Sequence, residues 1–134
     1  MKIIKIPTSR EKYFLQYLAL LYPIHKLRDK EMEVLSQLML YNDKYKNLDD
    51  DVRNKILFNA DTKMRIRQKL KMSDGSFNNN MVALRKKGII KDNILSKAWN
   101  IFLDDQPMDL VFKFIMICGN PRQREPGDFG SSWL

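Results

Sequence analysis

Apolar residues recur every three or four positions over two stretches near the start of the chain. The apolar positions of the first stretch are Tyr13, Phe14, Tyr17, Leu18 and Leu21. Because an α-helix turns once every 3.6 residues, these side chains share one wide face of a helix. Thr8 and Glu11 have the spacing of a capping box, so we predict that this helix begins near Ser9 and is stopped by Pro23.

The second stretch predicts a helix over residues 29–41, with Asp29 as its N-cap. The positions expected to face inward are Met32, Leu35, Leu38 and Met39. Residues 42–47 are polar and are predicted to form a loop. The three aspartates at 49–51 have two interpretations, a magnesium site or the start of a helix, where the helix dipole favours negative charge. We favour the helix start because no partner motif accompanies the aspartates.

The middle of the chain carries the most definite pattern. A helix capped by Asp61 or Thr62 is followed by a short turn and by a second helix capped by Ser73 or Asp74. The inward positions of the second helix are Phe77, Met81 and Leu84. Their spacings of four and three residues place them on one helical face, so we predict a helix-turn-helix here.

Three further segments are extended or ambiguous. Lys2–Ile6 has a β-like pattern that Pro7 ends, and Met108–Ile117 alternates in the way of a strand. The later strand can pair with the first, or with the extended segment that begins at Ile89. A strand left at a free edge would invite pairing with another chain. Residues 94–102 fit either a helix or an irregular strand.

The 134 residues carry a formal net charge of +8, which is unevenly distributed. Residues 61–91 hold 9 Lys and Arg against 2 Asp and Glu, whereas residues 92–134 are slightly acidic. A localised positive field attracts phosphate backbones, anionic membrane surfaces or acidic protein faces. The length leaves room for one domain rather than two.

Few residues are available for catalysis or metal binding. The only cysteine, Cys118, excludes an intrachain disulfide and fits a reducing compartment, and the only histidine, His25, excludes two-histidine metal motifs. We interpret Cys118 as inert packing and His25 as a plain loop or surface residue. We therefore predict no catalytic, cofactor-binding or metal-binding residues, no cofactor and no enzymatic activity. No apolar run reaches the ~20 residues of a membrane span, so no membrane partner is predicted.

The run over residues 84–90 reads leucine, arginine, two lysines, glycine and two isoleucines. Together with Met72-Ser73 in the turn and the apolar face of the helix between them, it resembles the winged helix-turn-helix family. In that family such a run closes the recognition helix and enters the first wing strand. The segment 27–38 is similar to the first helix of the module. The resemblance covers residues 27–95, although the linker over 42–61 is longer than the family's usual one.

The resemblance implies a fold that is mainly α with a small β-sheet: a winged helix-turn-helix with an extra N-terminal helix and an extended C-terminal arm. A single domain would span residues 1–118, with the helix-turn-helix at about 61–91, and the arm would span 119–134. The large apolar side chains of the arm are Phe129, Trp133 and Leu134. We predict that they contact a partner protein, because such groups gain nothing from exposure to water.

The resemblance also implies a surface for double-stranded DNA. The residues predicted to enter the major groove are Ser76, Asn78, Asn79 and Asn80. The residues predicted to neutralise phosphates are Lys63, Arg67, Arg85, Lys86, Lys87 and Lys91. An asparagine amide can pair with adenine in the major groove, although arginine at the start of the helix is the commoner base reader.

Two hypotheses for function stay open. In the first, the protein is a non-enzymatic structural component of a larger assembly, because its Lys-, Asn- and Ile-rich sequence is similar in style to small bacteriophage proteins. It would then be a virion protein of a head–tail connector or ring, or a packaging-associated protein, assembled in the host cytoplasm as a homo-oligomer or with other chains. In the second, it is a cytoplasmic winged-helix transcription regulator that binds double-stranded DNA.

Overall fold

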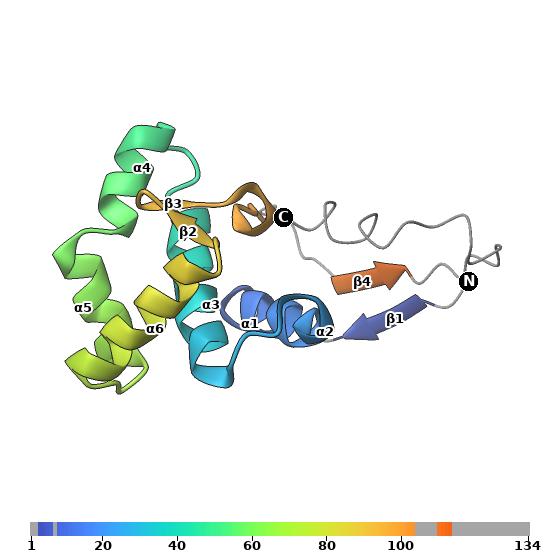
Figure 1. Ribbon diagram of the computed structural model, residues 1–134. Helices are drawn as coiled ribbons and strands as arrows, with labels where there is room; N and C mark the ends of the chain where they lie inside the picture. Colours follow the sequence, from blue (N-terminus) through green and yellow to red (C-terminus); the bar gives the residue numbers. More distant parts are fainter. Residues whose placement is uncertain (1–2, 7, 104–109, 114–134) are drawn as a thin grey trace, which may run out of the picture.

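The computed structural model describes residues 3–6, 8–103 and 110–113. In chain order its elements are β1 (Ile3–Ile6), α1 (Arg10–Leu20), α2 (Tyr22–His25), α3 (Asp29–Lys44), α4 (Asp50–Leu57), α5 (Ala60–Lys69), α6 (Asp74–Lys86), β2 (Ile90–Lys91), β3 (Ile94–Leu95), the 3₁₀ helix η1 (Lys97–Trp99) and β4 (Leu110–Lys113). The described chain is mainly helical, with two small antiparallel sheets of two strands each (Figure 1). This agrees with the predicted class. No helix within these residues is long and apolar enough to cross a membrane.

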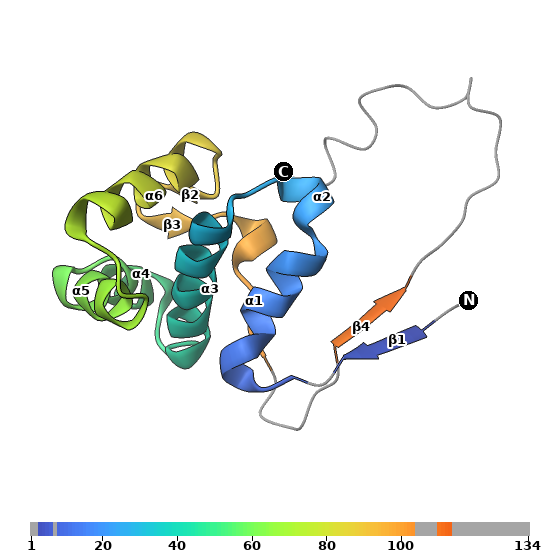
Figure 2. The same ribbon diagram turned by 90° about the horizontal axis from the view of Figure 1, so that it is seen from below.

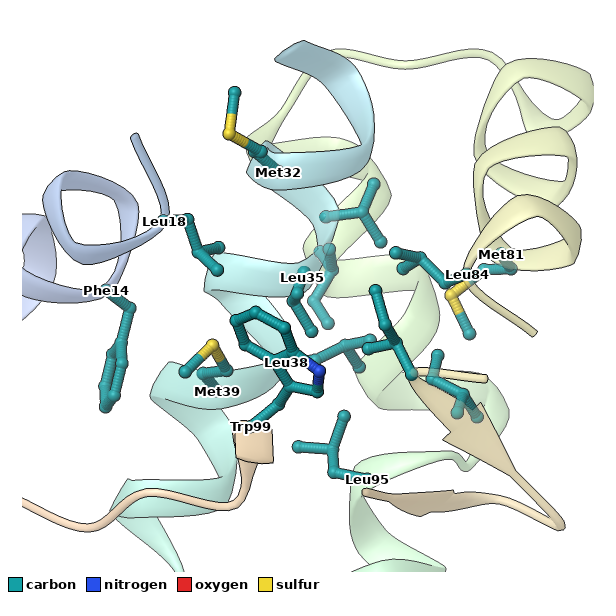
Figure 3. Close-up of a cluster of buried hydrophobic side chains, with 14 of the residues drawn as sticks. Phe14, Leu18, Met32, Leu35, Leu38, Met39, Met81, Leu84, Leu95 and Trp99 are labelled. Carbon is teal, nitrogen blue, oxygen red and sulfur yellow. The ribbon is translucent and has the colours of Figure 1, made fainter. Parts of the chain in front are cut away.

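Helix α3 lies at the centre of the helical body, and it packs against α1, α4, α5 and α6 (Figure 2). Its predicted inward positions are confirmed: Leu35, Leu38 and Met39 are fully buried and Met32 nearly so. Figure 3 shows side chains from α1, α6, β3 and η1 converging on this helix. Those labelled there are Phe14, Leu18, Met81, Leu84, Leu95 and Trp99. One continuous core therefore joins the N-terminal helix to the helix-turn-helix.

The N-terminal helix has the predicted apolar face and the predicted start next to Ser9, but it lacks the predicted capping box and ends before Pro23. Phe14 and Leu18 are fully buried on α1. The predicted capping box is absent, because Ser9 is the N-cap and accepts no side-chain hydrogen bond. Pro23 also acts differently from the prediction. It lies in the first turn of the short helix α2, where the missing N–H of proline would have no helical partner in any case.

Helix α3 continues three residues beyond its predicted end. Residues 42–47 were expected to form a loop, yet Asn42 and Asp43 are buried and helical. Both side chains have partners far along the chain: Asn42 Nδ2 donates to Asn100 Oδ1 over 2.7 Å, and Asp43 Oδ1 accepts from the Leu103 N–H over 2.7 Å. Tertiary hydrogen bonds thus offset the weak helix propensity of these residues. The N-cap of α3 is Arg28 rather than Asp29.

The three aspartates begin a helix, as predicted. Asp49 is the N-cap of α4, and Asp50 and Asp51 lie in its first turn. Arg53 follows within this helix and is 3% exposed. Its guanidinium donates to Asn42 Oδ1 over 2.9 Å and pairs with Asp50 over 2.6 Å, so α4 is fastened to the end of α3.

Two helices joined by a short turn, α5 and α6, lie where the sequence predicted a helix-turn-helix. The cap of α5 was predicted two or three residues late, because Asn59 is the N-cap and its side chain accepts from the Thr62 N–H. The cap of α6 is Ser73, as predicted, and it accepts from the Ser76 N–H. The apolar face of α6 is buried at the three predicted positions, Phe77, Met81 and Leu84.

A short hairpin follows α6. Strands β2 and β3 pair antiparallel over two residues each, and the connecting residues Asp92 and Asn93 both have positive φ. A two-residue connection with both φ values positive is the turn that matches the natural twist of a hairpin. The ambiguous segment 94–102 is neither a regular helix nor a strand throughout, since it contains β3 and then η1.

The second sheet joins the two ends of the described chain. Strand β1 pairs antiparallel with β4 in the register Ile3 to Lys113 and Ile6 to Leu110, so the later strand pairs with the N-terminal segment. Figures 1 and 2 show this sheet beside α1, standing away from the helical body. The remainder of the predicted strand 108–117 lies outside the described residues. So do Cys118 and the arm over 119–134, with Phe129, Trp133 and Leu134.

Candidate nucleic-acid interface

Helix α6 presents two contrasting faces. Phe77, Met81 and Leu84 point into the core, while the opposite side of the helix is exposed. In Figure 2, α6 lies at the edge of the helical body with α3 on its inner side, and no described element covers its outer side. The outer face of this 13-residue helix is therefore free to meet a macromolecule.

The four residues predicted to enter a DNA groove divide into two groups. Ser76, Asn78 and Asn79 are exposed, and the amides of Asn78 and Asn79 form no hydrogen bond to another described residue. Asn80 differs, because its Nδ2 donates to the Ser76 carbonyl over 2.9 Å and lies 3.9 Å from Met72 Sδ. Its amide supports the turn before α6 instead of facing outward.

Three of the predicted phosphate contacts are exposed cations close to the end of α6. Arg85 and Lys86 lie in the last turn, and Lys91 lies on β2. None of the three forms an ion pair with a residue in the described ranges. Positive charge at this end of a helix is also favourable toward the helix dipole. These side chains are available to a phosphate backbone.

Arg67 has an internal role that the sequence did not reveal. Its Nε lies 2.8 Å from Asp74 Oδ1, and its Nη1 donates to the Met72 carbonyl over 3.3 Å. The side chain is 28% exposed. One guanidinium thus spans the turn between α5 and α6 and fixes the angle between the two helices.

Lys87 is engaged in the same way. Its Nζ lies 2.6 Å from Glu31 Oε2, and the Glu31 side chain is 5% exposed. This pair joins the end of α6 to the first turns of α3. Lys87 is therefore a positioning residue within the fold, next in sequence to the outward-facing Lys86.

The cations of α5 point in several directions. Lys63 is half-buried, one helical turn before Arg67. Arg65 is exposed and pairs with Asp61 over 3.1 Å, and Lys69 lines a separate hollow with α1 and α3. The structure therefore places Arg85 and Lys86 on the same helix as the exposed asparagines and Lys91 on the strand that follows, but does not add the whole basic stretch to one surface.

Sequence reasoning missed two cations at the start of α3. A hollow of about 620 Å³ lies between the beginnings of α3 and α6. Its lining residues are Arg28, Asp29, Lys30, Gly75, Ser76, Asn79 and Asn80. Arg28 and Lys30 stand at a helix N-terminus, where the dipole disfavours positive charge. Lys30 pairs within α3 itself, because its Nζ lies 3.4 Å from Glu33 Oε2.

His25 is a structural residue rather than a plain loop or surface residue. Its Nε2 lies 2.6 Å from the Leu18 carbonyl, and its Nδ1 accepts from the Leu27 N–H over 2.9 Å. An accepting Nδ1 places the proton on Nε2, so the ring is neutral. Burial is the main cause that lowers the pKa of His25; Lys87 lowers it further, and the Leu18 hydrogen bond opposes the shift. Both ring nitrogens are thus occupied by the backbone.

Metal ligands do not gather anywhere in the described ranges, where no group of three or more His, Cys, Asp or Glu could hold an ion. The buried acids have protein partners instead: Asp43 pairs with Arg10 and Glu31 with Lys87. The chemistry that the surface offers is therefore hydrogen bonding by amides and attraction by cations.

No protein-family model, curated protein or solved structure matches this chain.

Proposed function

We propose that this protein binds double-stranded DNA through a winged helix-turn-helix module in which α6 is the recognition helix. The observation that carries the proposal is the outer face of α6. It exposes Asn78 and Asn79 without internal hydrogen bonds and ends in two cations, Arg85 and Lys86, without ion pairs to described residues. Amides for base edges beside cations for phosphates are the two kinds of contact that duplex recognition requires.

The order of elements supports the module. Helix α3 takes the place of the first helix, α5 and α6 form the helix-turn-helix, and the β2–β3 hairpin takes the place of the wing. The hairpin is small, and its tip lies beside α4, where Asp92 and Asp51 line the same hollow. Two carboxylates there would repel a phosphate backbone, so we assign phosphate contact to Lys91 on β2 rather than to the tip.

The dimensions also fit a major groove. Thirteen helical residues span about 20 Å, and a single α-helix fills a groove about 12 Å wide. Cations then flank the helix at both ends, with Arg28 and Lys30 near its start and Arg85 and Lys86 near its finish. The proposal is of a binding protein and assigns no residue to catalysis.

The test is a fluorescence-anisotropy titration with a labelled 20-base-pair duplex at about 50 and 200 mM salt. We expect binding that weakens steeply with salt, because phosphate contacts release condensed counterions. The double variant Arg85→Ala/Lys86→Ala should bind more weakly and reduce the salt slope by about two. The matched control, Lys12→Ala/Lys55→Ala, removes two exposed lysines from α1 and α4. No binding at the lower salt, or an equal loss in the control, would refute the proposal.

A second candidate function is a structural role in a larger assembly, such as a connector, ring or packaging-associated protein of a bacteriophage virion. The β1–β4 sheet favours it. Each strand has one edge without a partner strand among the described elements, and an isolated two-stranded sheet is only marginally stable in water. Pairing with another copy of the chain would complete the sheet, and the basic surface would then face packaged DNA.

Light scattering after size-exclusion chromatography tests this second function. An assembly protein should form a discrete oligomer at micromolar concentration. Replacing Lys5, which lies opposite Val111 in the register, by proline should shift that oligomer toward monomer, because proline removes a strand N–H. A monomer at every concentration would exclude the homo-oligomeric form of this role.

A further inference from the structure

The outermost line of α6 has an unusual composition. Counting outward from the buried face, the residues most opposite to Phe77, Met81 and Leu84 are Gly75, Asn79, Val82 and Lys86. Their spacings of four, three and four residues place them in one row along the helix. We call this row the outer stripe.

Asn79 lies in the first half of the outer stripe, and its side-chain amide is open to solvent. It is exposed and makes no hydrogen bond to another described residue, in contrast to Asn80. An amide offers one acceptor and two donors, which match the N6 and N7 atoms of adenine in the major groove. Guanine presents only acceptors there, O6 and N7, so the amide oxygen of asparagine would have no donor to pair with.

Val82 is the apolar exception in the outer stripe. Its side chain is 43% exposed, and it is β-branched, which is unfavourable in a helix. It lies on the side away from the core, so packing within the described chain does not explain it. One helical turn separates it from Asn79. A small apolar side chain at such a place matches the C5-methyl group of thymine.

Gly75 leaves the start of the outer stripe without a side chain. A Cβ at this position would meet no atom within 4 Å, so neither packing nor a positive φ requires glycine. Glycine in a helix costs about 1 kcal/mol relative to alanine. The absence of a side chain there allows the first turn of α6 to approach the floor of a groove closely.

The first turns of α6 contain no residue of the type that reads guanine. The described residues 74–81 contain no arginine or lysine, and the cations of α6 lie in its last turn. Arginine or lysine bound to O6 and N7 is the commonest specific contact to guanine. Lys86, the last residue of the outer stripe, lies one helical turn beyond Val82 and is assigned to phosphate contact. The earlier part of the stripe therefore carries groups for adenine and for thymine but no cation for guanine.

We infer that α6 reads adjacent A·T base pairs in the major groove, with Asn79 on adenine and Val82 on a thymine methyl group. Three helical residues rise 4.5 Å, close to the 3.4 Å between neighbouring base pairs, so the two side chains address successive pairs. This inference rests on the proposed function, since it names the sequence class that the same surface prefers.

The experiment begins with selection of bound sites from a random duplex library by the full chain. The site recovered is then measured in three forms: unmodified, with uracil in place of thymine, and with 7-deazaadenine in place of adenine. Uracil lacks only the C5-methyl group, and 7-deazaadenine lacks only the N7 acceptor. The phosphate charge is identical in all three duplexes, so general electrostatic affinity cancels.

We expect selection to enrich adjacent A·T pairs. Uracil should lower the affinity of the wild type severalfold and leave that of Val82→Ala unchanged. 7-Deazaadenine should lower the affinity of the wild type severalfold, because it removes one of the two hydrogen bonds of a bidentate contact, and leave that of Asn79→Ala unchanged. The matched controls are Val52→Ala on α4 and Asn47→Ala before it, which make the same chemical changes at exposed residues elsewhere. Both should respond to the modified bases as the wild type does.

Three outcomes would overturn the inference while leaving DNA binding intact. The selected sites could be rich in G·C pairs or show no base preference, or the Val82→Ala variant could still lose affinity when uracil replaces thymine. Absence of binding to any duplex at low salt would instead remove the proposed function itself, and the inference with it. Circular dichroism spectra and melting temperatures of the variants separate loss of a contact from loss of the fold.

Discussion

Lys87 Nζ lies 2.6 Å from Glu31 Oε2 and joins the end of α6 to α3, whereas its neighbour Lys86 faces solvent. Two adjacent lysines therefore have separable roles. Lys87→Ala leaves a buried carboxylate without its cation and should lower the free energy of unfolding by about 1–3 kcal/mol. Lys86→Ala should change it by less than about 0.5 kcal/mol.

Urea denaturation of the two variants measures this difference, and the DNA titration provides the complementary readout. Lys86→Ala should weaken duplex binding at unchanged stability. Glu31→Gln should cost less than Lys87→Ala, because its amide oxygen still accepts from the lysine. Equal stabilities for the Lys86 and Lys87 variants would show that the ion pair contributes nothing to the fold.

Arg53 is the most deeply buried cation in the described part of the chain, and it links three segments. Besides Asn42 and Asp50, its guanidinium reaches the Leu48 carbonyl over 3.1 Å. Arg53→Ala leaves the buried Asn42 oxygen without this donor and should reduce the free energy of unfolding by about 1–3 kcal/mol. The control Lys55→Ala removes an exposed cation from the same helix. Thermal and urea melts compare them, and a similar small effect of both would contradict the role given to Arg53.

Protein stability should fall as the pH is lowered through His25's titration range. Burial lowers the pKa of His25 in the folded chain, with Lys87 adding to the effect, while in the unfolded chain the pKa stays near 6.5. The unfolded state then binds more protons, so unfolding becomes more favourable as the pH falls below about 6.5. Above this value the histidine is neutral in both states and contributes no pH dependence.

Urea melts between pH 5 and 8 measure this effect in the wild type and in His25→Gln. Glutamine cannot titrate but retains one donor and one acceptor for Leu18 and Leu27. The free energy of unfolding of His25→Gln should change less between pH 5 and 7 than that of the wild type. Parallel profiles for the two proteins would assign the pH dependence to other groups.

Two helices end with the same hydrogen-bond pattern but with different residues at the left-handed position. After α5, Lys71 has φ 55° and the Met72 N–H donates to the Arg67 carbonyl; after α6, Gly88 has φ 77° and the Ile89 N–H donates to the Leu84 carbonyl. A side chain at such a φ is strained, whereas glycine is not.

Lys71→Gly should therefore raise the melting temperature, by an amount equivalent to about 0.5–1 kcal/mol. Gly88→Ala should lower it by a similar or larger amount. Differential scanning calorimetry of the two variants provides the measurement. A lower melting temperature for Lys71→Gly would mean that the lysine side chain contributes more packing than its backbone strain costs.

The sequence predicted the elements whose information is local. The buried faces of α1, α3 and α6 follow from apolar spacing alone, and the cap at Ser73 follows from its residue type. The end of α3 could not be predicted, because Asn42 and Asp43 are helical on account of partners near residues 100–103. These hydrogen bonds join residues that are 58 and 60 positions apart, so a short window of sequence does not contain both partners.

The same reason limited the predicted site. Composition shows that residues 61–91 are basic, but a lysine that is free and a lysine that is paired look alike in a sequence. Arg67 and Lys87 were separated from Arg85 and Lys86 only by their distances to Asp74 and Glu31. The exposed asparagines, in contrast, were located correctly on α6 by helical spacing from Phe77.

The contacts of Leu103 bear on where this chain can be truncated. The Leu103 N–H donates to Asp43 and its carbonyl accepts from Lys46, while Trp99 lies 5.8 Å from the His25 ring. A truncation after the hairpin would remove these contacts and leave Asp43 Oδ1 without its donor, while Arg10 would still pair with Asp43 Oδ2. A shortened form of this protein should therefore keep Leu103.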